Sequence, residues 1–381
     1  MKYAVVNCDI YTGEQVLFDK AIVVNGERIE AIVDLDKVPK HLDVIDIGGL
    51  NIAPGFIDLQ VNGGGGVLFN DELTEAGVSK IYDAHKRFGT TSFLPTLITT
   101  SVDRMLQAIE VVKSCTKNGK SGVLGLHIEG PYISRTKAGA HDKNNIRNIS
   151  NDELRILLQT GREVIKVITV APEAVKEDHI RLLVQNNIMV SAGHSEATYE
   201  QAMEAFKWGV SQTTHLFNAM TQFSSREPGL VGATLDSANV WAGIIADGFH
   251  VHFASIRICK RIKGKKLLLV TDSMPPVGSK NSEFTLGDVK VQCRNGRCVT
   301  SDGTLAGSDL DMATAVRNCV QKIGIPLDEA LRMASTYPAE AIGSSDALGR
   351  IKPGYMADMV IFNNQVVVEG IVARGEYQKV A

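Results

Sequence analysis

The sequence lacks any apolar run long enough to cross a bilayer, because no stretch of about 18 apolar residues occurs in the chain. A signal peptide is also missing from the first ten residues, where Asn7 and Asp9 interrupt the apolar side chains. Basic charge is not in excess, with 40 Lys and Arg against 43 Asp and Glu and a net charge of -3. These absences argue against a membrane protein and against a nucleic-acid-binding surface, and we expect a cytoplasmic protein.

The cysteines lack the CxxC spacing of common metal and redox motifs, although six are present. Cys293 and Cys298 flank a turn at Asn295 and Gly296 and could face each other across a hairpin. Since nothing indicates export, we expect reduced thiols at this pair. Low-complexity segments and short-period repeats are missing too, and the composition, 44% hydrophobic and 22% charged, is that of an ordinary globular protein.

The middle of the chain alternates apolar, β-branched runs with amphipathic stretches. The stretches at 72–88, 102–117, 174–186 and 198–208 have helical spacing and polar faces. Alternating strands and helices predict right-handed crossovers and a parallel sheet. Eight such units favour an α/β fold with a (β/α)8 barrel of the TIM type over an open sheet. The eight strand-like runs are 55–61, 91–98, 122–128, 164–170, 188–192, 211–214, 240–246 and 267–271.

Both ends of the chain show short alternating strands instead. Residues 21–33 form a clear hairpin pattern, which resumes at 357–362 and 365–372. Neither end can bury a core alone, so we expect one small β-sandwich domain built from residues 1–52 and 346–381. The barrel domain would be residues 53–345, with a β-hairpin insertion at about 284–299. Two helices, at about 309–323 and 327–342, would lead back to the small domain.

Four residues with versatile chemistry, Glu129, His194, His215 and Asp272, stand just past the ends of predicted strands. Because the strands of such a barrel end at one face, these side chains can meet in one bowl. One carboxylate and two imidazoles suit a metal ion with a position left for water. Asp272 could then take a proton from that water. The pattern predicts a metal-dependent hydrolase.

Each of these residues also has a more ordinary interpretation when it is taken alone. A single histidine after a strand is usually a hydrogen-bonded structural residue, and a single aspartate there is often a helix N-cap. Two histidines and one carboxylate also occur in non-haem iron oxygenases, and a non-catalytic scaffold could keep the fold. Four such residues with a separate base favour hydrolysis. His127, one strand pitch below Glu129, is expected to fill the barrel.

Seven segments, in order, resemble the amidohydrolase superfamily and, within it, the N-acetylglucosamine-6-phosphate deacetylase family. They include His-Ile-Glu-Gly-Pro at 127–131, Ala-Gly-His-Ser at 192–195 and Thr-His-Leu-Phe-Asn-Ala-Met at 214–220. The other segments are 53–60, 94–100, 245–250 and 270–272, and the tail at 348–360 also fits. The resemblance covers essentially the whole chain. It implies hydrolysis of the acetamide of N-acetyl-D-glucosamine 6-phosphate to glucosamine 6-phosphate and acetate, in amino-sugar catabolism.

The resemblance also implies roles for individual residues. Glu129, His194 and His215 would hold one divalent metal per subunit, with Zn²⁺ as the default and Fe²⁺, Mn²⁺ or Co²⁺ as alternatives. Asp272 would activate water and then protonate the departing amine, while His141 would polarise the acetamide carbonyl. The substrate would be bound by His141, Asn62, Asn218, Ala219, Arg226 and His250, of which the last two would hold the phosphate. In the family this pair tends to come from the neighbouring subunit, which implies a homodimer with shared active-site residues.

The first strand departs from the superfamily pattern, in which many members carry a His-x-His pair that supports a second metal. The corresponding residues here are Gln60 and Asn62. Amides are poor ligands for a transition metal compared with imidazole, so we expect a single metal. Gln60 could still contact that metal. The alternative function is that of another mononuclear amidohydrolase with a different N-acyl substrate.

Overall fold

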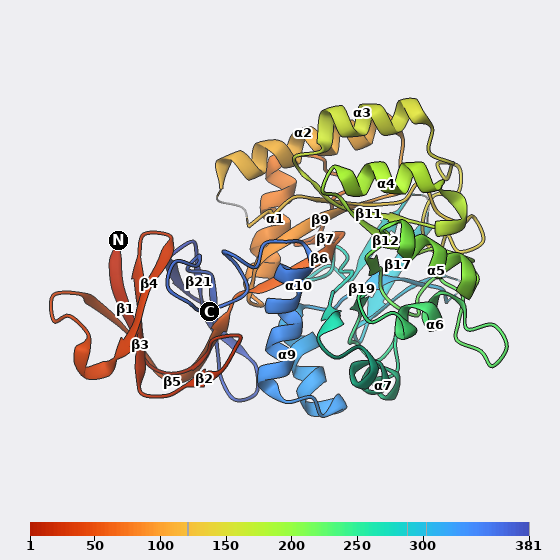
Figure 1. Cartoon of the computed structure of the whole chain (residues 1–381). Helices are drawn as coiled ribbons and strands as arrows, with labels where there is room; N and C mark the ends of the chain where they lie inside the picture. The colour runs from red at the N-terminus through yellow and green to blue at the C-terminus, as the bar shows by residue number, and fades with distance from the viewer. Residues whose placement is uncertain (120–121, 288, 302, 381) are drawn as a thin grey trace.

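The computed structural model describes residues 1–119, 122–287, 289–301 and 303–380, and its centre is a barrel of parallel strands (Figure 1). The strand order is β15-β14-β13-β12-β11-β10-β9-β6, and a parallel bridge between Val61 and Ser273 closes the barrel. Every predicted strand overlaps one of these strands, which confirms the predicted barrel. Their bounds are β6 (Phe56–Val61), β9 (Thr90–Ile98), β10 (Leu126–Glu129), β11 (Ile165–Val170), β12 (Met189–Ala192), β13 (Gln212–Thr213), β14 (Trp241–Ile244) and β15 (Leu267–Leu269).

Helices cover the outside of the barrel (Figure 1). The four amphipathic stretches became α1 (Glu75–Lys86), α2 (Val102–Asn118), α4 (Glu177–Gln185) and α5 (Tyr199–Trp208). No range had been predicted for α3 (Asn151–Gly161), α6 (Gly229–Asp236) or α7 (Phe253–Lys263). The two helices predicted after the insertion are divided into α8 (Met312–Asn318), α9 (Leu327–Ala334) and α10 (Thr336–Ala341), with a π-helical turn at Cys319–Ile323.

A second sheet lies beside the barrel and takes strands from both ends of the chain. Its order is β22-β21-β20-β5-β1-β3-β4, and β2 pairs with β1. The bounds are β1 (Lys2–Tyr11), β2 (Val16–Leu17), β3 (Lys20–Asn25), β4 (Arg28–Asp34), β5 (Asp43–Pro54), β20 (Met359–Phe362), β21 (Val368–Ala373) and β22 (Glu376–Lys379). Because β5 pairs with β1 on one side and β20 on the other, the two ends form one unit, as predicted. The exact domain boundaries stay a prediction.

The insertion after strand eight is larger than the predicted hairpin. It contains four antiparallel strands, β16 (Glu283–Leu286), β17 (Val289–Arg294), β18 (Arg297–Thr300) and β19 (Leu305–Ser308). We call it the insertion sheet. Cys293 and Cys298 are joined by a disulfide, so the expectation of reduced thiols is wrong for this pair. The physical reason is the register of β17 and β18, which places the two residues directly opposite each other with a Cα–Cα distance of 4.0 Å.

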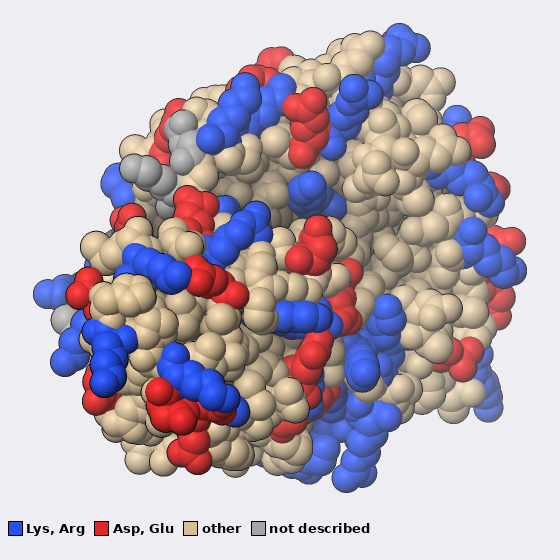
Figure 2. Space-filling model, turned by 60° about the vertical axis from the view of Figure 1, so that its left-hand side comes forward, with Lys and Arg blue, Asp and Glu red and all other residues tan. Residues whose placement is uncertain are grey.

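The surface gives no sign of a large single-signed field on the face drawn in Figure 2, where Lys and Arg are interspersed with Asp and Glu. An anionic ligand would therefore depend on local donors and cations.

A short pair of strands, β7 (Gly63–Gly64) and β8 (Val67–Leu68), follows the first barrel strand. Within the described ranges, no helix is both long enough and apolar enough to cross a membrane.

Gly375 joins the two ends of the chain, and we expect Gly375→Ala to lower the free energy of unfolding by at least about 2 kcal/mol. Its φ is +76°, and a Cβ atom there would lie 1.8 Å from the carbonyl oxygen of Gly26. The carbonyl oxygen of Gly375 also accepts a hydrogen bond from the Tyr3 hydroxyl at 3.0 Å, so the segment cannot easily move away. Urea unfolding followed by circular dichroism measures the loss.

Gly48→Ala is the matched control, because Gly48 has a φ of +65° but a Cβ atom added there would meet nothing within 4 Å. It should lose only the conformational part, about 1 kcal/mol. Equal losses in Gly375→Ala and Gly48→Ala would show that close packing of the two chain ends contributes nothing measurable.

Candidate active site

The predicted site residues lie at the carboxyl ends of barrel strands, where the loops of such barrels build active sites. Glu129 is the last residue of β10, while His194, His215 and Asp272 follow β12, β13 and β15 by two or three residues. The three that follow strands have positive φ values, 48° for His194, 29° for His215 and 51° for Asp272. Such angles are uncommon outside glycine and carry strain, which functional sites often hold. The backbone therefore turns sharply as it leaves these strands.

Glu129, His194 and His215 bring their ligand atoms together. Nε2 of His194 lies 3.1 Å from Oε1 of Glu129, and Nε2 of His215 lies 3.0 Å from the same oxygen. The two Nε2 atoms are themselves 3.0 Å apart. Around a tetrahedral zinc ion, ligand atoms at bond lengths of about 2.0–2.1 Å stand roughly 3.3 Å from one another. Two imidazole nitrogens and a carboxylate oxygen at such spacing fit a divalent metal ion.

Burial and charge make this cluster suited to a cation. The side chains of Glu129, His194 and His215 are all at most 7% exposed. Burial alone would raise the pKa of Glu129, but hydrogen bonds from the two histidines outweigh it and hold that pKa well below the usual carboxyl range. Burial lowers the pKa of His215, but the hydrogen bond with Glu129 and its charge raise it overall. A carboxylate that stays ionised in a buried place is a strong site for a positive ion.

Neighbouring groups orient the predicted ligands. Nδ1 of His194 lies 2.8 Å from the carbonyl oxygen of Lys137, so it donates a proton there and turns Nε2 towards the other two predicted ligands. The amide nitrogen of Gln60 donates to both oxygens of Glu129 at 3.2 Å and to Oδ1 of Asp272 at 3.1 Å. Gln60 therefore holds the two carboxylates, and its contact with a metal stays a prediction.

Asp272 has the surroundings of a tunable acid and base. Its Oδ1 accepts a hydrogen bond from Nδ2 of Asn62 at 2.6 Å, in addition to the one from Gln60. Burial, followed by the negative charge of Glu129, raises the pKa of Asp272 to about 6. A carboxyl with a pKa in that range can take a proton and release it near neutral pH.

A buried aspartate below Asp272 supports the segment that carries it. Asp58 accepts hydrogen bonds from Oγ1 of Thr271 at 2.5 Å and from the backbone N–H of Thr271 at 3.3 Å. The backbone N–H of Asp272 donates to the carbonyl oxygen of Gln60 at 3.0 Å. These bonds tie the end of strand eight to strand one. No role for Asp58 was predicted from the sequence.

His141 is buried next to the cluster, with its ring centre 4.3 Å from that of His194. Nδ1 lies 2.7 Å from Oγ1 of Thr99 and 3.4 Å from the Thr99 backbone N–H. A backbone N–H can only donate, so Nδ1 is the acceptor and the proton of the neutral ring stands on Nε2. Burial, followed by the charge of His194, lowers the pKa of His141 to about 3, which keeps the ring neutral. His141 thus presents an N–H donor.

A cavity of about 510 Å³ unites most of the predicted site residues. Its walls include Asn62, Glu129, His141, His194, His215, Asn218, Ala219, His250 and Asp272. The cavity also has wall residues from the insertion sheet. A larger neighbouring cavity of about 900 Å³ shares His141 but contains none of the predicted metal ligands, so we place the chemistry in the smaller one.

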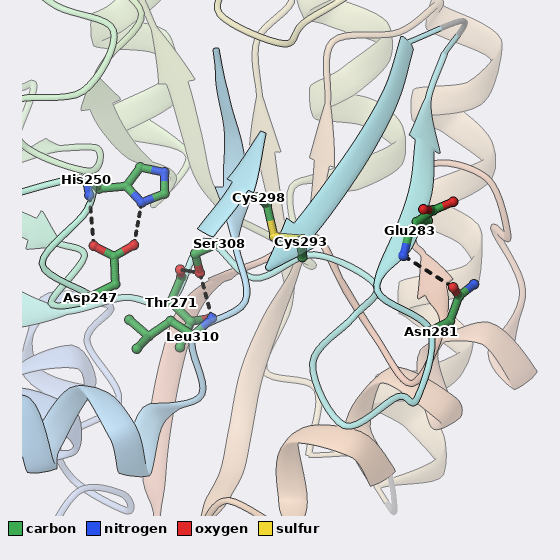
Figure 3. The surroundings of a disulfide bond; sticks show 9 residues. All are labelled: Asp247, His250, Thr271, Asn281, Glu283, Cys293, Cys298, Ser308 and Leu310. Atoms are coloured by element: carbon green, nitrogen blue, oxygen red, sulfur yellow. Dashed lines mark hydrogen bonds and ion pairs between the residues drawn. A yellow bond between two sulfur atoms is a disulfide. The ribbon is translucent and has the colours of Figure 1, made fainter. Parts of the chain in front are cut away.

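The predicted phosphate-binding residues are not all in this cavity. His250 lines it, with Nδ1 bonded to Asp247 at 2.6 Å, which leaves Nε2 available (Figure 3). Within the described part of the chain, the backbone N–H of Ala219 has no hydrogen-bond partner, as expected of a group that awaits an anion. Arg226 is exposed on the loop before α6 and does not line the cavity of its own chain. Its role at a neighbouring subunit stays a prediction.

The structure also explains the role of His127. His127 lies inside the barrel, where Nδ1 contacts the carbonyl oxygen of Leu59 and Nε2 contacts the Thr169 hydroxyl, so it fills the barrel as predicted. The hydroxyl of Thr99 contacts His141, and the carbonyl oxygen of Lys137 contacts His194, so these two residues orient site histidines. Their roles could not be predicted from the sequence, because threonine and lysine are common in loops without such contacts.

Comparisons with known proteins agree with this geometry. The model of the amidohydrolase family matches residues 51–377, and that of the NagA composite domain matches residues 2–52. The chain is 41% identical to N-acetylglucosamine-6-phosphate deacetylase of Haemophilus influenzae, over 100% of both chains. It is 40% identical to N-acetylgalactosamine-6-phosphate deacetylase of Shewanella sp., over 85% of this chain and 82% of the other. The crystal structure of N-acetylglucosamine-6-phosphate deacetylase from Pasteurella multocida has a TM-score of 0.97 and 43% identity, with 100% of both chains covered.

Proposed function

Because this chain belongs to the amidohydrolase family, we propose that it hydrolyses the acetamide of N-acetyl-D-glucosamine 6-phosphate, releasing acetate and D-glucosamine 6-phosphate. The observation that carries the proposal is the convergence of Glu129, His194 and His215 beside Asp272 in one cavity. The full-length relative from Haemophilus influenzae supports this substrate.

Glu129, His194 and His215 are the residues that would hold the metal, with zinc as the proposed ion. When bound by these residues, a divalent ion would supply Lewis-acid chemistry, polarising a carbonyl oxygen and lowering the pKa of water from 15.7 towards about 7. Asp272 accepts the proton of the attacking water and then donates it to the departing amine nitrogen. His141 donates from Nε2 to the carbonyl oxygen, where negative charge develops.

The sugar phosphate is held by the opposite part of the cavity. Ala219 and His250 line this cavity, and the backbone N–H of Ala219 and the imidazole of His250 can donate hydrogen bonds to phosphate oxygens. Asn62 and Asn218 offer amide groups for sugar hydroxyls. A homodimer in which Arg226 reaches the partner's phosphate site, and a cytoplasmic location, complete the proposal as predictions from the sequence.

N-acetylgalactosamine 6-phosphate is a second candidate substrate, favoured by the Shewanella relative of 40% identity. The two sugars differ only in the orientation of one hydroxyl, at carbon 4. If the glucosamine proposal holds, kcat/KM should be at least about 10-fold higher for the glucose epimer, the effect of one hydrogen bond to a sugar hydroxyl. A reversed ratio would assign the galactose epimer as the substrate.

The proposed reaction is tested by acetate release from phosphorylated and unphosphorylated N-acetylglucosamine, before and after chelation and return of Zn²⁺, Fe²⁺, Mn²⁺ or Co²⁺. Hydrolysis of the phosphorylated sugar alone, lost on chelation and restored by metal, is the expected result. Turnover that survives complete metal removal would exclude the proposed mechanism. Absence of turnover in fully metal-loaded protein would direct the search to other N-acyl substrates.

A further inference from the structure

The insertion sheet forms one wall of the cavity, although the proposed function gives it no role. Wall residues from this sheet and its loop are Leu286, Arg297, Gly303, Thr304, Leu305 and Gly307. Arg297 is the only one of these with a charged side chain, and an arginine keeps its charge at any physiological pH. Its position in the fold therefore bears on how an anionic substrate is recognised.

Backbone hydrogen bonds attach the insertion sheet to the segment that carries Asp272. The N–H of Ser308, at the end of β19, donates to the carbonyl oxygen of Asp272 at 3.0 Å, and the N–H of Met274 donates to the carbonyl oxygen of Ser308 at 2.9 Å. Arg297, the first residue of β18, is paired with Ser308. Arg297 thus stands one strand away from the Asp272 backbone, in a position fixed by the sheet.

The turn that precedes Arg297 lies close to the loop that carries His250. A Cβ atom on Gly296 would lie 3.4 Å from the ring of Phe249, the residue immediately before His250. The disulfide between Cys293 and Cys298 joins the two strands directly below this turn. Figure 3 shows this disulfide together with the Asp247–His250 pair. Arg297 therefore enters the cavity from the side of His250, the side assigned to the phosphate.

The guanidinium group of Arg297 is available to bind a ligand. Among the residues that the structure describes, no side chain or carbonyl group forms a hydrogen bond or ion pair with it. Lys137 is the other long cationic side chain on the cavity wall, but its backbone holds His194, so it belongs to the metal side. Arg226 lies outside the cavity of its own chain. Among the described residues that line this cavity, Arg297 is thus the only arginine.

We propose that Arg297 binds the 6-phosphate of the substrate and so sets the preference for a phosphorylated sugar, from within the same chain as the metal site. The inference rests on the proposed function for the identity of the anion. A planar guanidinium can donate two parallel hydrogen bonds to phosphate oxygens, and a phosphate dianion in a chain of net negative charge requires such donors. The contact is remote from the scissile amide, so it contributes to binding of ground state and transition state alike.

The test compares Arg297→Ala with Arg294→Ala in acetate release from N-acetylglucosamine 6-phosphate. Arg294 is the cross-strand partner of Arg297, equally basic and exposed, but it does not line the cavity. Arg297→Ala should raise KM about 10-fold to 100-fold, the effect of one charged hydrogen-bonding group, while kcat changes by less than about 3-fold. Arg294→Ala should have the KM of the wild type. The KM of Arg297→Lys should lie between those of the wild type and Arg297→Ala, because lysine keeps the charge but lacks the planar guanidinium.

An unchanged KM in Arg297→Ala, or the same increase in Arg294→Ala, would overturn the proposal. Should the metal-loaded wild type release no acetate from this sugar, the proposed function fails, and phosphate binding is then measured directly. Calorimetric titration of the wild type and Arg297→Ala with inorganic phosphate serves this purpose. Weaker binding by the variant would support an anion site at Arg297, whereas equal binding would overturn it.

Discussion

Asp272→Asn is expected to lower kcat at least about 100-fold while the protein keeps its metal. An amide cannot accept the proton of the attacking water, and it cannot return one to the departing amine. The fold should persist, because Oδ1 of an asparagine can still accept the hydrogen bonds that Asn62 and Gln60 donate to Asp272. Acetate release gives kcat, and mass spectrometry of the purified protein gives the metal content.

Asp311→Asn is the control for this substitution. Asp311 caps α8 by accepting a hydrogen bond from the N–H of Thr314, a bond that asparagine also makes, and it lies outside the cavity. The control should keep wild-type kcat and metal. Normal turnover in metal-loaded Asp272→Asn would remove Asp272 from the proton transfer and leave its hydrogen bonds as its only role.

His194→Asn is expected to lose the metal and, with it, at least about 1000-fold in kcat/KM. A metal ion contributes several kcal/mol of transition-state stabilisation, and about 1.36 kcal/mol corresponds to a factor of ten. Asparagine is chosen because His194 has a φ of 48°, an angle that asparagine tolerates better than alanine does. Its amide is a poor ligand compared with imidazole.

His252→Asn gives the matched comparison, since His252 is exposed and caps α7 through Nδ1. Asparagine is a good N-cap, so this variant should bind metal and turn over substrate like the wild type. Dialysis against a fixed concentration of Zn²⁺, followed by mass spectrometry, compares the three proteins. A full metal content in His194→Asn would mean that the ion is held by a different set of residues, for which Glu129 and the neighbouring His141 are candidates.

The barrel and the metal cluster were predictable because their signals are local. Parallel barrel strands are buried on both faces, so they show as continuous apolar runs such as Leu267–Leu269. The residue types that bind metals then stand out where each run ends. Strand ends meet at one face of a barrel, so four positions far apart in the chain could be assigned to one site.

Other features were missed because their physical cause is not local. The helix α6 is apolar on all sides and contains Gly229 and Gly232, so it has no amphipathic period. Reduced thiols were expected at Cys293 and Cys298 because a cytoplasmic location was expected. Whether these two residues meet is decided instead by the register of the strands that carry them. Arg297 was not predicted as a site residue, because it lies on the short strand β18. It lines the cavity only through the way in which the whole insertion sheet is attached to the barrel.

Arg226 and His250 show a different limit. Both were assigned to the phosphate from the resemblance, which identifies residues but not the subunit from which each one acts. In the folded chain, His250 lines the cavity, whereas Arg226 lies outside it on an exposed loop. The fold of a single chain can therefore separate residues that act together in an assembly, and Arg226 stays a prediction for a dimer.

The sheet shared by both ends of the chain has a consequence for the chain while it is being translated. β5 is made early, yet the strand that covers its free edge, β20, is translated only after the entire barrel, roughly 300 residues later. At about 5–20 residues per second, that edge stays open for some 15–60 s on the ribosome. An uncovered strand edge can pair with other chains, so a nascent or prematurely terminated polypeptide is the form most exposed to aggregation.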